Sequence, residues 1–265
     1  MRYHIDTHVH LYHCYDAAAI LVSASNRLAM PDAPANLVLC LTESAGFNFY
    51  QILVAHAREQ TLYAGYTITR LDGNPALLLS RNGEQIIIIA GRQVVSSDKL
   101  EVLALYCDYE FQDGTASQKI IDDIADNGGI AVLPWGVGKW LGDRGHIVTR
   151  LLQENSPSRL AIADISSRPF TWPLPSQFRL ADKLGYNTLY GTDPLPLTHD
   201  QERVASAGML ADLPAEKSSA VAQLKTMLLS SPFQQYGSRV STLRFIRDQV
   251  MLRGDNSDCL QQSAG

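Results

Sequence analysis

Short apolar runs and segments with apolar residues at helical spacing alternate along most of this 265-residue chain. Runs of four to eight apolar residues bounded by turn residues predict buried strands, and apolar residues three and four apart predict amphipathic helices. The predicted strands are 3–9, 37–42, 130–135, 159–165 and 186–193, and the predicted helices are 17–29, 43–59, 115–129, 145–155, 175–185, 199–229 and 240–252. Strands that alternate with helices are typical of right-handed βαβ units around a parallel sheet or barrel. Since no repeat or linker interrupts the pattern, residues 1–265 are predicted to form a single domain.

The alternation of strands and helices is interrupted between residues 61 and 106. Five strand-like segments follow one another there, separated by turn sequences such as DGNP, RNGE and SSDK. Consecutive strands joined by short polar turns favour hairpins. We therefore predict an antiparallel β-hairpin insert around 61–106.

Composition narrows the class of protein. The formal net charge is −5, with 46% hydrophobic and 18% charged residues, which is an ordinary globular balance. A nucleic-acid-binding protein normally presents a basic face, so the mild acidity predicts no nucleic-acid partner. The longest apolar run is far shorter than a membrane span, and the N-terminus has no apolar signal segment, so no membrane association and a cytoplasmic location are expected. The four cysteines form no CxxC pair and are interpreted as free thiols, and the last residues, 255–265, as a frayed tail.

Candidate chemistry is concentrated near the N-terminus, in the segment YHIDTHVHLYHCYD. It holds four of the seven histidines. Residues two apart in a strand point to the same face, so His8 and His10 project together, with Asp6 if the strand is regular. Two adjacent imidazoles form a natural chelate for a divalent ion such as Zn, Mn or Fe. We predict that His8 and His10 bind a metal.

Two carboxylates could complete this metal site. Asp193 ends a predicted strand and is followed by Pro194, which stops the strand, so Asp193 is predicted as a metal ligand or general base; the alternative is a turn-capping aspartate. Glu43 ends the predicted strand 37–42 and is a further candidate ligand. Its alternative role is that of an acid favoured at a helix start.

Five segments in this order resemble motifs of the PHP (polymerase and histidinol phosphatase) family. They are DTHVH, LVLCLTES, IIAGRQVVSSDKLEVLALY, IIDDIADNGGIAVLPW and YGTDPLP, and they lie within residues 4–197. The resemblance implies a distorted (β/α)7–8 TIM-like barrel with metals at the carboxyl ends of the strands, and hydrolysis of phosphate esters.

The sequence departs from that family pattern at several ligand positions. Only His8, His10 and Asp193 match by type, with Glu43 as a plausible substitute. The other family positions carry Ser44, Gln93, Glu101, Pro134 and Leu195. The resemblance therefore supports one or two ions. Amidohydrolases and TatD-like enzymes offer a similar pattern, in which the last-strand aspartate binds metal and takes a proton from the bound water.

A glycine-rich loop, GVGKWLGDRG, follows the predicted strand 130–135. Lys139 and Arg144 lie near the start of the next helix, where free N–H groups also favour anions, so both are predicted to bind an anionic substrate and stabilise developing charge. Arg168, after another strand, could join this anion pocket. The alternative for each is a structural or solvated cation; a carboxylated Lys139 that bridges metals is a weaker option.

These features lead to a metal-dependent hydrolase of a small anionic substrate, with a phosphate ester first and an amide or lactone second. The competing hypothesis is a catalytically decayed barrel that acts as a ligand-binding or scaffold protein. Metal content separates the two. The apolar helix faces Val221/Leu224/Leu228 and Leu243/Ile246/Val250 are predicted to pack on the barrel or to form a homo-oligomer interface.

Overall fold

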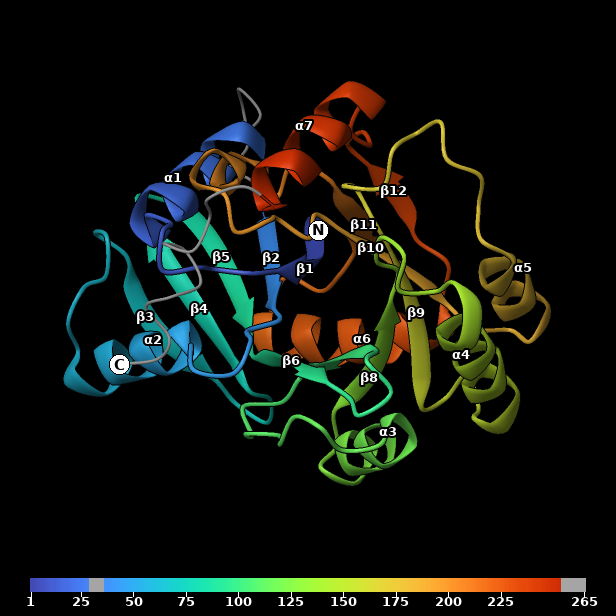
Figure 1. Ribbon diagram of the computed structural model, residues 1–265. Helices are drawn as coiled ribbons and strands as arrows, with labels where there is room; N and C mark the ends of the chain where they lie inside the picture. The colour runs from blue at the N-terminus through green and yellow to red at the C-terminus, as the bar shows by residue number, and fades with distance from the viewer. Residues whose placement is uncertain (29–35, 254–265) are drawn as a thin grey trace.

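The computed structural model describes residues 1–28 and 36–253 (Figure 1). The strands are β1 (Arg2–Val9), β2 (Asn36–Leu41), β3 (Thr67–Leu71), β4 (Ala76–Arg81), β5 (Glu84–Ile89), β6 (Gly91–Val95), β7 (Glu101–Leu105), β8 (Ile130–Pro134), β9 (Leu160–Ile165), β10 (Thr188–Gly191), β11 (Gly208–Asp212) and β12 (Gln234–Tyr236). The helices are α1 (Ala17–Leu28), α2 (Phe49–Glu59), α3 (Ser117–Asp126), α4 (Gly142–Glu154), α5 (Ser176–Lys183), α6 (Lys217–Ser230) and α7 (Thr242–Arg253), with a 3₁₀ helix η1 at Thr198–Arg203. The tail at 255–265 and the end of the predicted helix 17–29 lie outside the described residues.

Two mixed sheets replace the predicted closed barrel. One has seven strands in the order β12-β11-β1-β2-β5-β4-β3, and the other has five in the order β10-β9-β8-β7-β6. Among the strands of the described residues, only β1–β2–β5 and β8–β9–β10 pair in parallel. The TIM-like barrel was wrong because β11 pairs with one edge of β1 and β2 with the other. A strand has only two hydrogen-bonding edges, so β10 lies beside β1 without joining its sheet.

The strands of 61–106 exist, but they are not an insert. β3, β4 and β5 pair antiparallel, yet β5 also pairs with β2 inside the seven-stranded sheet. β6 and β7 belong to the other sheet, where β7 pairs with β8. Gly91 lies where the chain crosses between the sheets, and a Cβ there would approach Leu41 O to 2.2 Å. The hairpin pattern was recognisable locally, whereas the partner strands are decided by tertiary packing.

The core has three layers of apolar contact. The central layer lies between the sheets and includes Ile5, Val38, Leu103 and Val132, with the buried face of α6 against it. α1 and α2 pack on the outer face of the seven-stranded sheet, and α3, α4 and α5 pack on the outer face of the five-stranded sheet (Figure 1). This arrangement directs the carboxyl ends of β1, β8, β9 and β10 to a common region.

The C-terminal part differs from its prediction. The predicted helix 199–229 contains η1 and strand β11 before α6 begins, because pairing with β1 overrides the local pattern. Val221, Leu224 and Leu228 are buried in the central layer, whereas Leu243, Ile246 and Val250 on α7 are exposed. Homo-oligomer formation through α7 stays a prediction.

Two further expectations are corrected or limited. Cys40 and Cys107 are buried free thiols, but Cys14 is disulfide-bonded, so the interpretation of all four cysteines as free thiols was wrong: the sequence has no CxxC spacing that would have signalled a pair. Among the described helices, none is both long and apolar enough to cross a membrane.

Candidate metal centre and anion pocket

Three potential ligand atoms meet at the carboxyl end of β1. His8 Nε2 lies 3.0 Å from His10 Nε2, and Asp193 Oδ1 lies 3.3 Å from the first imidazole nitrogen and 3.5 Å from the second. Donors held about 2.0–2.2 Å from one ion at angles of roughly 90–110° are separated by about 3.0–3.5 Å. The triangle formed by His8, His10 and Asp193 therefore has the dimensions of one face of a metal coordination shell.

The close approach of β10 to β1 creates this triangle. A Cβ on Gly191 would approach His8 N to 2.6 Å, so only glycine permits the approach. The Asp193 N–H donates to His8 O at 2.9 Å, and Asp193 has φ +46°, a left-handed conformation that aspartate tolerates better than most residues. The strained backbone turns the carboxylate toward both imidazoles.

The Asp6 carboxylate is used in structural hydrogen bonds and does not belong to the triangle of candidate ligands. Its carboxylate accepts hydrogen bonds from Thr192 N at 2.9 Å and Ala205 N at 3.0 Å, and also from the Thr192 hydroxyl. Burial raises the pKa of Asp6 to about 6, and these hydrogen bonds oppose the shift. The pairing register shifts between Asp6 and Val9, so the regular alternation that would place Asp6 with the histidines ends here.

The electrostatics of the triangle suit a cation. Burial lowers the pKa of both His8 and His10 to about 3, so both imidazoles are neutral at pH 7 and have a lone pair to offer. Burial raises the pKa of Asp193, while His10 and Lys139 favour its charged form. His8 Nδ1 has no hydrogen-bond partner among the described residues, and Gln93 contacts both imidazoles. A donor set of two nitrogens and one carboxylate fits Zn, Mn or Fe.

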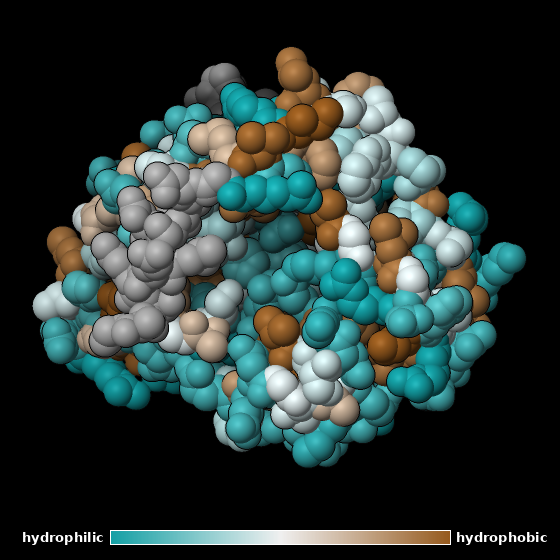
Figure 2. Space-filling view, viewed as in Figure 1, coloured by the Kyte–Doolittle hydropathy of each residue, from teal (hydrophilic) through white to brown (hydrophobic). Residues whose placement is uncertain are grey.

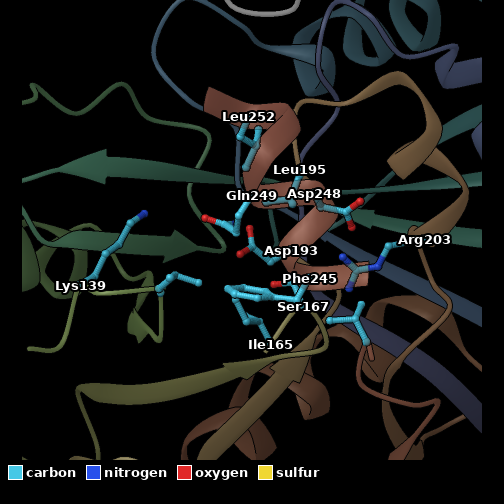
Figure 3. Close-up of a pocket in the computed structure, with 13 residues that line it drawn as sticks. Lys139, Ile165, Ser167, Asp193, Leu195, Arg203, Phe245, Asp248, Gln249 and Leu252 are labelled. Atoms are coloured by element: carbon cyan, nitrogen blue, oxygen red, sulfur yellow. The ribbon is translucent and has the colours of Figure 1, made fainter. Parts of the chain in front are cut away.

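A pocket of about 220 Å³ opens beside the triangle (Figure 3). Its wall includes Asp193 and two cations, Lys139 and Arg203, which lie on opposite sides of Asp193 in Figure 3. Ile165 and Phe245 supply apolar surface. The wall therefore combines the cations Lys139 and Arg203 with the acids Asp193 and Asp248 beside the candidate metal ligands, and we call this cavity the anion pocket.

Lys139 was predicted from the glycine-rich loop, and the structure places it in the pocket wall. Its ammonium group forms an ion pair with the carboxylate of Glu101, at the start of β7. β7 runs antiparallel to β8, so its first residue lies at the carboxyl end of β8. Burial raises the pKa of Glu101, and the Lys139 charge opposes this shift.

Arg203 in η1 was missed by sequence reasoning. The side chain is buried and donates to Thr192 O at 3.1 Å and to Asp200 Oδ2 at 3.3 Å, and it also bonds the Ser166 hydroxyl. No motif surrounds Arg203 in the sequence, and only the folding of η1 against β10 brings it to the pocket. Arg203 lies in the pocket wall, where Arg144 and Arg168 were predicted to lie.

Arg144 and Arg168 do not line this pocket. Arg144 donates to Gly138 O at 2.8 Å. Arg168 is 2% exposed and forms two hydrogen bonds with the Asp164 carboxylate, at 2.6 and 2.8 Å. The Arg168 guanidinium is therefore paired with Asp164 inside the protein and does not line the pocket.

Glu43 does not join the triangle either. Its carboxylate accepts hydrogen bonds from the backbone N–H groups of Phe49 and Tyr50, the first residues of α2. This is the alternative role, an acid at a helix start. Burial raises the pKa of Glu43 to about 7, although the hydrogen bonds from α2 oppose the shift.

A second group of metal-ligand residue types lies close by. His199, Asp200 and Asp248 offer ligand atoms within 4.8 Å of one another. Arginines compensate their charge: Arg203 and Arg244 contact Asp200, while Arg244 and Arg247 contact Asp248. With its carboxylates already paired, this group has no need of a metal.

Comparisons with known proteins support the fold but not a family. No family model matches the sequence, and no curated protein matches it. The crystal structure of PsfC from Pseudomonas syringae is similar, with a TM-score of 0.62 and 17% identity over 95% of this chain and 98% of that one. The lesion-specific endonuclease PfuEndoQ from Pyrococcus furiosus is similar with a TM-score of 0.53 and 10% identity, over 89% of this chain and 59% of that one.

The second likeness corrects one expectation. Net acidity was used to exclude a nucleic-acid partner. That exclusion was wrong, because an endonuclease has this fold. Net charge reports the average over a whole surface, whereas contact with an anion depends on the few cations at one site.

Proposed function

We propose that this protein is a metal-dependent hydrolase that acts on a phosphate ester through a single divalent ion. The observation that carries the proposal is the triangle of His8, His10 and Asp193 beside a pocket with two cations. Neutral imidazoles and a carboxylate supply the ligands, and the cations supply charge complementary to a phosphate.

A divalent ion bound there would lower the pKa of a water molecule and polarise the ester. The residues of the chain account for the remaining requirements. Asp193 directs Oδ1 to the histidines, and its carboxylate accepts the proton that the attacking water loses. Lys139 binds the phosphate oxygens, and the buried guanidinium of Arg203 adds positive charge at the pocket wall that stabilises the charge developing on them. Phe245 reduces the access of bulk water to the pocket.

One ion is favoured over two because the Glu101 carboxylate, which interacts electrostatically with Asp193, is already paired with the Lys139 ammonium. Gln93, at a position where the PHP pattern has a glutamate, is a neutral side chain. A second cation would therefore find one compensated acid and one uncharged amide.

We also propose membership of the PHP family as a divergent member. The support is the order of the five sequence motifs together with the position of His8, His10 and Asp193 at strand ends. The likeness to an endonuclease extends the range of esters worth testing to phosphodiesters, including damaged DNA.

The test has two stages. Protein purified without added metal is first assayed for Zn, Mn and Fe, beside a His8→Ala/His10→Ala variant; about one equivalent is expected in the wild type and almost none in the variant. A screen of phosphomonoesters, phosphodiesters, abasic duplex DNA, amides and lactones then follows with the loaded protein. Metal-dependent turnover of an amide or lactone alone would redirect the assignment to an amidohydrolase. Failure to retain any metal would favour the ligand-binding scaffold.

A further inference from the structure

A second pocket, of about 580 Å³, lies between the loops that follow β8 and β9. Its wall contains Trp135, Trp140 and Trp172, which are all three tryptophans of the chain. Both loops leave the carboxyl ends of their strands, the same end of the sheets as the metal triangle. The volume falls within the range of small-molecule sites, about 300–1,000 Å³.

The aromatic wall is rigid. The Trp135 and Trp172 rings meet edge to face at 5.9 Å, and the Trp140 ring lies 5.1 Å from that of Phe178. The Arg168 guanidinium lies over the Trp135 ring at 5.9 Å and is held in place by Asp164. In the segment Trp172–Pro173–Leu174–Pro175, two prolines restrict the backbone. A preformed wall of this kind binds a ligand at a low entropic cost.

The rim of the pocket exposes large apolar side chains. Leu141 is 72% exposed, Leu174 43% and Trp172 36%. Figure 2 shows hydrophobic surface among hydrophilic residues on the side of the molecule where Figure 1 places α4 and α5. Exposed apolar residues gathered around a cavity mark a surface that binds an apolar group. Indole walls favour a planar aromatic one, through stacking and edge-to-face contacts.

The pocket adjoins the anion pocket. Gly136 lines both, and the Trp172 ring contacts the Phe245 ring of the anion pocket at 4.9 Å. The stem of Lys139 packs against Gly136, where a Cβ would lie 2.5 Å from Lys139 Cδ. An anion held by Lys139 is therefore separated from the tryptophans by a residue without a side chain.

We infer that the tryptophan pocket binds a planar aromatic group of the same substrate whose anionic group enters the anion pocket. The substrate class is then an anionic ester of an aromatic or heteroaromatic alcohol. For its anionic end this inference rests on the proposed function, whereas the aromatic end rests on the second pocket alone.

The experiment compares the binding of three probes to the Mn-loaded protein by calorimetry and tryptophan fluorescence: methylphosphonate, phenylphosphonate and 2-naphthol. Burial of a phenyl ring predicts that phenylphosphonate binds about tenfold or more tightly than methylphosphonate. Trp172→Ala removes the most exposed indole of the aromatic wall and Thr149→Phe fills the cavity; both should reduce the preference to less than about threefold, with methylphosphonate affinity unchanged. Phe170→Ala, an exposed aromatic outside the pocket wall, is the matched control and should behave as wild type.

The possible results distinguish the aromatic site from the proposed hydrolase function. Equal affinity of the two phosphonates for the wild type, or a preference that survives both pocket variants, overturns the inference and leaves the proposed hydrolase intact. Binding of 2-naphthol that is lost in both pocket variants supports the aromatic site, even if neither phosphonate binds; that last result would count against the proposed function alone. The His8→Ala/His10→Ala variant should keep its affinity for 2-naphthol.

Discussion

Two corners of this protein contain the same kinds of side chain but treat their charge differently. In one, His8, His10 and Asp193 bring three ligand atoms within 3.5 Å, and His8 Nδ1 has no hydrogen-bond partner in the described part of the chain. In the other, His199, Asp200 and Asp248 are surrounded by three arginines. Residue type and proximity alone therefore do not define a metal site. A site for a cation needs donors whose charge and lone pairs the protein has left uncompensated.

The largest effect is expected from removing the imidazoles of the first corner. His8→Ala/His10→Ala should lower metal affinity by about a thousandfold or more, because only one protein ligand remains. The measurement is metal content after dialysis against a weak chelator. His199→Ala is the matched control from the second corner and should retain wild-type metal. An equal loss in the control would end the distinction between the two corners.

A smaller effect tests the arginine compensation of the second corner. Arg203→Gln leaves the buried Asp200 with less positive charge, so the free energy of unfolding should fall by about 3 kcal/mol. Arg247→Gln changes an exposed partner of Asp248 and should cost less than about 1 kcal/mol. Urea denaturation measures both. Equal free energies of unfolding for the two variants would contradict the expectation that a buried ion pair stabilises the protein more than an exposed one.

Glu43 is a buried acid that belongs to neither of these two corners, and its protonation should affect stability. Because burial raises its folded-state pKa from 4.5 to about 7, the folded protein binds a proton more tightly than the unfolded chain. The resulting stabilisation is full below pH 4.5 and is lost as the pH rises toward 7 and above. Between pH 5 and 7 the loss is about 2 kcal/mol by linkage, and it should be absent in Glu43→Gln. Denaturation at several pH values measures it; an unchanged slope in the variant would contradict this account.

The smallest effect concerns the cation of the first corner. Lys139→Met should weaken methylphosphonate binding by about tenfold, because it removes one charge from a partly exposed position. Metal content should stay near one equivalent, since Lys139 is not a ligand. Lys119→Met, which removes an exposed lysine paired with Asp123, is the control and should leave affinity unchanged. Equal affinity in wild type and Lys139→Met would exclude Lys139 from anion binding.

Sequence reasoning reached the histidine pair and Asp193 for a local reason. The i, i+2 spacing in a strand places His8 and His10 on one face, and the strand-like segment before Pro194 leads to Asp193, although β10 itself ends at Gly191. It could not reach Arg203, whose neighbours carry no motif, nor separate Glu43 from the ligand set, because the direction of a side chain at a strand end depends on where the next helix begins. Arg168 followed a strand as required, but Asp164 pairs with it inside the protein.

Local patterns were enough to predict the alternation of strands and helices, the hairpin character of 61–106 and the chemistry of the first strand, because these depend on periods of two and 3.6 residues and on side-chain type. Long-range contacts, by contrast, set the division of the strands into two sheets, the position of Arg203 in the anion pocket and the shared cavity of the three tryptophans. Each of these depends on contacts between residues far apart in the chain. Strand edges show this most clearly: β11 competes for the edge of β1, and no local pattern records which strand wins.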